Sequence, residues 1–112
     1  MSIKLLKQEE GAIRKISDSY SILNLLTAQD SSKMSIAISN AKNHDETTKT
    51  SSDRAYFILE GSITVDEKLI GKPGDIIFIP ANIEYKFKGS FRSILINSPP
   101  FKKENEQISK LK

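Results

Sequence analysis

Short runs of β-branched and aromatic residues, each bounded by turn-forming residues, recur along most of this chain. Such runs at short, regular spacing are typical of an all-β sandwich or barrel. The predicted strands cover residues 20–26, 34–39, 55–59, 62–65, 75–79, 84–87 and 91–97. Glycine or proline marks the predicted turns between them, at Gly61, Gly71, Gly74, Pro80 and Gly89. No stretch of helical length carries an apolar stripe, apart from a short turn or helix within residues 2–10.

Two polar stretches interrupt this pattern. Residues 40–53 are rich in Asn, Asp, Glu, Thr and Ser and contain His44, so we interpret them as a loop of about a dozen residues. Residues 102–112 follow Pro99-Pro100 and are predicted to form a polar, flexible tail. The expected organisation is therefore a single barrel over residues 1–101 followed by a tail over residues 102–112.

Composition narrows the class of protein. With 112 residues and 38% hydrophobic content, the chain has enough apolar side chains for one compact core. It contains no cysteine, so neither a disulfide framework nor a thiolate metal site can form. No segment approaches the roughly 20 apolar residues of a membrane span or the apolar run of a signal peptide. We therefore expect a soluble, cytoplasmic protein without a membrane partner.

The formal net charge of +3 does not by itself indicate nucleic acid binding. Four of the 17 basic residues and two of the 14 acidic ones lie in residues 102–112, which leaves 13 basic and 12 acidic residues in the body. The barrel is thus nearly neutral. Because nucleic acid binding requires a concentrated basic surface, we expect no nucleic acid partner.

Two segments carry a resemblance to a known family. The sequence RAYFILEGSITV, from Arg54 to Val65, is similar to the first cupin motif, and GDIIFIPANIEY, from Gly74 to Tyr85, is similar to the second. Asn82 stands where the family usually has glycine, and it is the other residue that best tolerates the left-handed conformation. The resemblance covers roughly residues 45–97 and implies a cupin-type antiparallel double-stranded β-helix, a jelly-roll barrel.

Cupins typically hold a divalent metal with two histidines and a glutamate from the first motif and one histidine from the second. In this chain the glutamate position falls on Arg54 and the second-motif histidine falls on Tyr85, while the two remaining histidine positions fall near Thr48 and Thr50, or Thr47 and Lys49. A guanidinium repels a cation, so we expect no metal and no cofactor. A different alignment leaves an alternative metal set of His44, Glu46 and Asp53.

Alternation along a strand places candidate ligand-binding residues. Arg54, Tyr56 and Ile58 should face one way, and the motif position of Arg54 makes that side the interior. By the same rule Tyr85 and Phe87 should face inward, so the predicted ligand-binding residues are Arg54, Tyr56, Tyr85 and Phe87. The guanidinium would bind a carboxylate or phosphate and the phenol would donate a hydrogen bond. Alternatively, Arg54 pairs with a carboxylate of its own barrel, such as Glu84, or lies at the rim.

These residues lead to three functional hypotheses. The first is a metal-independent cupin domain that binds a small, anionic molecule in the barrel. The second is an enzyme, either a metal-free isomerase or lyase acting on a sugar or acid, or a metal enzyme using His44. The third is a filled barrel that serves as a dimeric interaction module, since the outward-facing Phe57 and Leu59 favour a homodimer. The lone His44 is expected to lie in solvent, where it would carry no chemistry.

Overall fold

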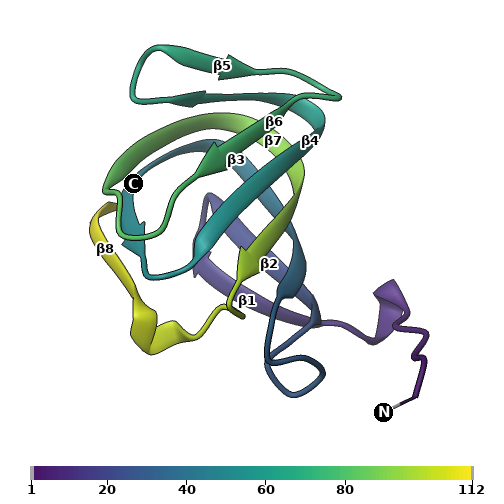
Figure 1. The fold of residues 1–112 in the computed structure, drawn as a ribbon. Coiled ribbons are helices and arrows are strands. Elements are labelled where there is room, and N and C mark those ends of the chain that lie inside the picture. Colours follow the sequence, from purple (N-terminus) through teal and green to yellow (C-terminus); the bar gives the residue numbers. More distant parts are fainter. Residues whose placement is uncertain (1, 112) are drawn as a thin grey trace.

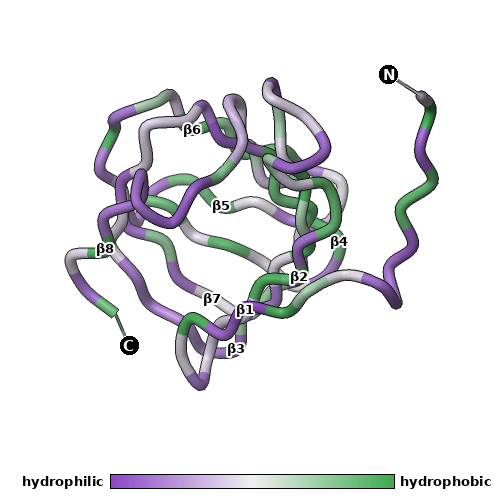
Figure 2. Tube along the Cα trace, turned by 90° about the horizontal axis from the view of Figure 1, so that it is seen from below, coloured by the Kyte–Doolittle hydropathy of each residue, from purple (hydrophilic) through white to green (hydrophobic). Residues whose placement is uncertain are grey.

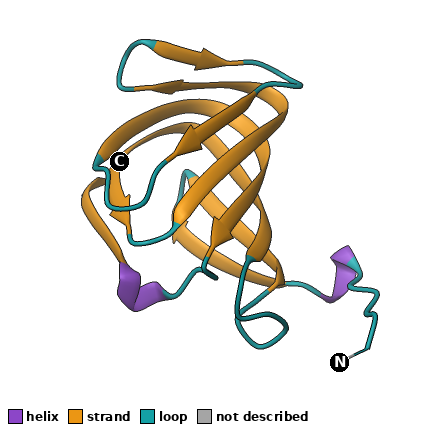
Figure 3. Ribbon diagram, viewed as in Figure 1, coloured by secondary structure: helices purple, strands orange, loops and turns teal. Residues whose placement is uncertain are grey.

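The computed structural model describes residues 2–111, which form eight β-strands and two short 3₁₀ helices (Figures 1 and 3). The elements are η1 (Gln8–Glu10), β1 (Ala12–Ser17), β2 (Tyr20–Leu26), β3 (Ser35–Thr50), β4 (Asp53–Val65), β5 (Leu69–Gly71), β6 (Ile76–Ile79), β7 (Tyr85–Ser98), η2 (Lys103–Asn105) and β8 (Glu106–Leu111). The all-β prediction is confirmed. Met1 and Lys112, which bound the predicted barrel and tail, lie outside the described residues.

All strands pair in antiparallel fashion in the order β1-β2-β3-β7-β4-β5, with β6 added to β4 and β8 added to β3. The three longest strands, β3, β7 and β4, lie next to one another. Figure 1 shows them curving around a common interior, while the β5 segment projects at one end of the barrel. The interior is therefore lined mainly by side chains of these three strands.

A bulge in β3 decides which polar side chains enter the barrel. The pairing of β3 with β7 shifts register between Ala41 and His44, and Asn43 there has a positive φ of 48°. Before the bulge the odd-numbered residues are buried, and after it the even-numbered ones are. Residues 40–50 are thus strand, and the predicted loop over 40–53 is wrong. The extra residues of the bulge break the alternation by which a strand is recognised in sequence.

Two glycines that suggest turns lie within continuous strands instead. Gly61 has a φ of 73° inside β4, next to a register shift between Ile58 and Glu60, and Gly89 has a φ of 137° inside β7. A Cβ on Gly61 would lie 2.1 Å from the backbone oxygen of Ser90, so the two strands approach too closely there for any side chain. The predicted turns at Gly61 and Gly89 are therefore bends in long strands.

The core consists of inward-facing apolar and aromatic side chains. Its large members are Tyr20, Ile22, Tyr56, Ile58, Ile63, Val65, Ile77, Ile79, Tyr85, Phe87, Phe91 and Leu95. Burial alternates from residue to residue along β4, β6 and β7, as expected for a barrel with one face toward the interior. Arg54, Tyr56 and Ile58 are buried and Phe57 and Leu59 are not, which confirms the predicted orientation of β4. Asn82 has a φ of 65°, as the motif requires.

The C-terminal segment is part of the sheet. β8 pairs with the second half of β3, where Glu106 lies opposite Thr50 and Gln107 opposite Lys49. The prediction of a flexible tail is wrong for residues 106–111, because they add a strand to the barrel. By contrast, the N-terminal residues before β1 run away from the strands as a separate segment (Figure 2). No helix in the described part of the chain is long and apolar enough to cross a membrane.

Candidate functional site

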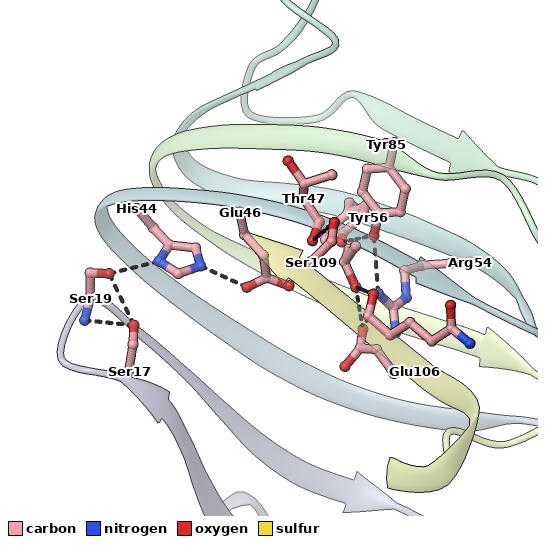
Figure 4. Close-up of polar contacts among 12 residues, drawn as sticks. Ser17, Ser19, His44, Glu46, Thr47, Arg54, Tyr56, Tyr85, Glu106 and Ser109 are labelled. Carbon is pink, nitrogen blue, oxygen red and sulfur yellow. Dashed lines mark hydrogen bonds and ion pairs between the residues drawn. The ribbon is translucent and has the colours of Figure 1, made fainter. Parts of the chain in front are cut away.

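Arg54 lies at the centre of a hydrogen-bonded cluster inside the barrel (Figure 4). Its Nε donates to Asn97 Oδ1 at 2.8 Å, and its Nη1 donates both to the Tyr85 hydroxyl at 3.0 Å and to Glu106 Oε2 at 2.9 Å. The exposed fractions of the Arg54 and Glu106 side chains are 3% and 7%. The expectation that Arg54 pairs with a carboxylate of its own barrel is confirmed, but the partner is Glu106, since Glu84 is exposed and accepts from Ser109.

The protonation states in this cluster follow from burial. Burial alone lowers the pKa of Arg54, but the oxygens of Tyr85, Tyr56 and Glu106 outweigh it and raise the pKa well above its usual value. Burial raises the pKa of Tyr56 and of Tyr85, although the Arg54 guanidinium partly offsets the shift of Tyr85. At neutral pH the cluster therefore holds a charged guanidinium and two neutral phenols, whose hydroxyls hydrogen-bond to each other.

The positions of the usual cupin metal ligands are all inside the barrel, but their side chains do not fit a metal. Thr48, Thr50, Arg54 and Tyr85 are each less than 4% exposed, which favours the alignment on Thr48 and Thr50 over that on Thr47 and Lys49. None of the four is a typical ligand of a divalent ion, and one is a permanent cation. Among residues 2–111, no group of three His, Cys, Asp or Glu side chains is placed to hold a metal ion.

The structure brings together only two of the three residues of the alternative metal set. His44 and Glu46 are 1% and 2% exposed, and His44 Nε2 lies 2.8 Å from Glu46 Oε1. Asp53 is exposed and accepts a hydrogen bond from the backbone N–H of Ala81 instead. The expectation of a solvated His44 is wrong, because the bulge in β3 turns its side chain into the barrel.

His44 connects the interior to the turn between β1 and β2. Its Nδ1 lies 2.6 Å from Ser19 Oγ, which in turn lies 3.1 Å from Ser17 Oγ. The imidazole stacks on the ring of Tyr20, with centroids 4.6 Å apart. Figure 4 shows the three polar residues in line, from Ser19 through His44 to Glu46, with Glu46 at the end of the line nearest the Arg54 cluster.

The interior holds little empty space. A cavity of about 10 Å³ lies among side chains that include Glu46, Arg54, Tyr56, Phe87 and Glu106, and this is room for about one water molecule. All four predicted ligand-binding residues are buried, and Arg54, Tyr56 and Phe87 line this cavity together with both carboxylates. A carboxylate already occupies the place predicted for an anionic ligand. Thr50 Oγ1 is also buried, without a hydrogen-bond partner among the described residues.

A larger hollow lies outside the interior. A groove of about 600 Å³ is bordered by the β1–β2 turn and by parts of β3, β4 and β7, and Ser17, Ser19 and Tyr20 line it. Its volume is typical of sites for small molecules. No motif or pattern in the sequence indicates this groove. Ser19 and Glu106 were missed as site residues too, since a serine in a turn and a glutamate near a chain end carry no motif.

Comparison with known proteins was made by sequence and by structure. A family model for the ethanolamine utilisation protein EutQ matches residues 2–99. The chain belongs to the EutQ family. The solved ethanolamine utilisation protein Q of Salmonella typhimurium LT2 shares 26% identity with it, covering 73% of this chain and 71% of that one, with a TM-score of 0.67. A search of curated proteins gives no match.

Other solved structures share the fold at lower identity. Pac13 from Streptomyces, described as a nucleoside dehydratase and solved with uridine, has a TM-score of 0.81 at 16% identity over 98% of this chain and 93% of its own. Ectoine synthase from P. lautus has a TM-score of 0.77 at 16% identity over 100% and 92%. Together with the EutQ match, these structures confirm the predicted small cupin domain with a jelly-roll barrel.

Proposed function

We propose that this EutQ-family cupin is a metal-independent domain that binds a small carboxylate inside the barrel, on Arg54. The observation that supports the proposal is the Arg54 cluster itself, in which Nη1 donates to Tyr85 and to the carboxylate of Glu106. A buried guanidinium fixed by Asn97 and Tyr85 is preorganised for a carboxylate, because those contacts hold its donors in place. Glu106 then stands in for the carboxylate of the ligand.

Entry of a ligand requires Glu106 to leave. Within residues 2–111, β8 pairs with β3 alone, and most of its residues are exposed, so this strand carries little buried apolar surface. Edge elements of this kind are released at lower free energy than the barrel core. A ligand carboxylate would take the position of Oε2 and restore the ion pair, while Tyr85 and Asn97 stay where they are.

The test is a calorimetric titration with propionate and succinate, and with their neutral amides as controls. We expect Glu106→Gln to bind a carboxylate about tenfold more tightly than the wild type, because the competing intramolecular carboxylate is gone. Arg54→Met should abolish binding, whereas Arg92→Met, which removes an arginine outside the interior, should not. Equal binding of acid and amide, or unchanged binding in Arg54→Met, would contradict the proposal.

A second candidate function is lyase chemistry without a metal. It is favoured by the buried His44–Glu46 pair, because Glu46 lines the same cavity as Arg54 and His44 can share a proton with it. Pac13, a nucleoside dehydratase, has been solved with uridine as variants at one histidine and at two tyrosines, and this barrel also holds one histidine and several tyrosines. Release of water from a hydroxylated substrate, lost in Glu46→Gln, would select this candidate.

The predicted homodimer remains a proposal. Ile76 and Phe78 on β6 are 65% and 59% exposed, and β6 pairs with the segment of β4 that carries Phe57. A second copy that covered this apolar strip would bury it. In sedimentation equilibrium we expect the mass of a dimer for the wild type and the mass of a monomer for Phe78→Ser.

A further inference from the structure

The three residues Ser19, His44 and Glu46 have the connectivity of a nucleophile, a base and the carboxylate that orients the base. Ser19 Oγ is 2.6 Å from His44 Nδ1, and His44 Nε2 is 2.8 Å from Glu46 Oε1. We propose that Ser19 is a nucleophile activated by His44 and that the groove beside it receives a short, apolar acyl ester or thioester. This activity is separate from carboxylate binding at Arg54.

The hydrogen bonds determine which atom gives up its proton. Glu46 can only accept from His44 when it is ionised, so Nε2 carries the hydrogen and Nδ1 is left with a lone pair. The Ser19 hydroxyl then donates to Nδ1. The Ser17 hydroxyl lies 3.1 Å away and also accepts the backbone N–H of Ser19, which keeps the serine in one orientation. A nucleophile, a base and an orienting group within hydrogen-bond reach are what covalent catalysis needs.

The base is held rigidly, while the nucleophile stands at the surface. His44 is buried, stacked on Tyr20 and near Phe87, so its ring cannot turn away from Ser19. Ser19 is half-buried and lines the groove of about 600 Å³. Solutes therefore reach the serine without entering the closed barrel. The same wall of protein excludes water from the imidazole.

The walls of the groove indicate the class of substrate. Ile13, Ala41 and Phe91 give it an apolar lining that suits a short acyl chain. The groove is also lined by charged residues of both signs, and Lys15 is paired with Asp18 at 2.9 Å. Lys42 and Arg92 supply the remaining positive charge that favours a developing oxyanion. An ester or thioester combines an apolar chain with a carbonyl that carries a leaving group, as transfer of an acyl group to a serine requires.

The reaction is balanced without any further reagent. Ser19 Oγ bonds to the acyl carbon as its proton moves to His44 Nδ1, and the alcohol or thiol leaves with that proton. A water molecule then attacks the acyl serine, gives its proton to Nδ1, and the acid is released while Ser19 recovers its hydrogen. Glu46 touches neither the substrate nor the reacting atoms and is a positioning residue.

A small alkyl fluorophosphonate, which labels activated serines, tests the proposal on the 112-residue chain. Intact mass and peptide mapping should show one adduct, on Ser19, that is lost in Ser19→Ala and kept in the control Ser51→Ala, an exposed serine outside the groove. His44→Gln should lower the labelling rate about a hundredfold. Glu46→Gln should lower the labelling rate about tenfold and displace the midpoint of the pH profile of labelling. If Glu46 had only a structural role, that midpoint would not move.

A parallel assay follows hydrolysis of p-nitrophenyl butyrate, where a burst of one nitrophenolate per chain is expected for an acyl serine. Circular dichroism establishes whether each variant is folded. If His44→Gln does not fold, Ser19→Ala still tests whether Ser19 is the nucleophile. Failure of the folded wild type to form an adduct would overturn the proposal. So would an adduct that survives Ser19→Ala. Neither result depends on whether carboxylates bind to Arg54.

Discussion

The ion pair between Arg54 and Glu106 yields a quantitative prediction about stability. Both side chains are less than a tenth exposed, so removing one leaves the other charge buried without its partner. Losses of this kind cost about 3–5 kcal/mol, and we expect about 3 kcal/mol for Glu106→Ala because Tyr85 and Asn97 still hold the guanidinium. For a domain of this size that lowers the melting temperature by roughly 12 °C. Urea unfolding followed by circular dichroism gives the free energy directly.

A double-mutant cycle separates the pair from its surroundings. Arg54→Met should cost about 4 kcal/mol, and combined with Glu106→Ala the loss should fall short of the sum by about 2 kcal/mol. Glu104→Ala, an exposed glutamate two residues away, should change the free energy of unfolding by less than about 0.5 kcal/mol. If Glu106→Ala matched that control, β8 would not place its glutamate in the barrel, and the basis for a carboxylate site would be lost.

Three further predictions concern the backbone, pH and metals. Gly61→Ala should destabilise the fold by more than about 2 kcal/mol in urea unfolding, against about 1 kcal/mol for Gly74→Ala, because a Cβ meets Ser90 at the first and open space at the second. The free energy of unfolding should fall as pH rises above 10, because the unfolded chain then loses phenolic protons that the folded chain keeps. The expected fall is about 1.4 kcal/mol per pH unit for each buried tyrosine. Tyr56→Phe should flatten that slope in alkaline urea titrations. Protein purified without chelators should hold less than one equivalent of manganese, iron, nickel or zinc by elemental analysis, with or without His44→Ala.

The fold could be predicted from sequence where strand alternation is uninterrupted. The strand at 20–26 agrees with β2 to the residue, and the motif segments around Arg54 and Tyr85 face inward as alternation requires. The second half of β3 was not predicted, because odd-numbered residues are buried before the bulge at Asn43 and even-numbered residues after it. After the bulge, His44, Glu46, Thr48 and Thr50 alternate again, but polar residues inside a barrel resemble polar residues in a loop.

The candidate site could be predicted only on the motif side. Arg54 and Tyr85 were found because the cupin pattern assigns their positions, whereas Glu106 comes from a separate strand whose pairing leaves no local signal. Ser19 was missed for a similar reason, since it reaches His44 across 25 positions of sequence. Long-range polar contacts depend on the register of strands that meet only in three dimensions, and one sequence does not report that register.

One physical requirement, the pairing of a buried charge, explains the polar residues in the interior of this barrel. The motif positions Thr48, Thr50, Arg54 and Tyr85 all point into the interior of the barrel. In this chain Arg54 supplies the positive charge, and Glu106, Asn97 and Tyr85 satisfy its donors. Buried polar groups persist only when they are hydrogen-bonded, and buried charges only when they are paired, so a guanidinium at this position requires an internal carboxylate. β8 is therefore as much a part of the site as the motif strands, and any ligand of Arg54 must compete with it.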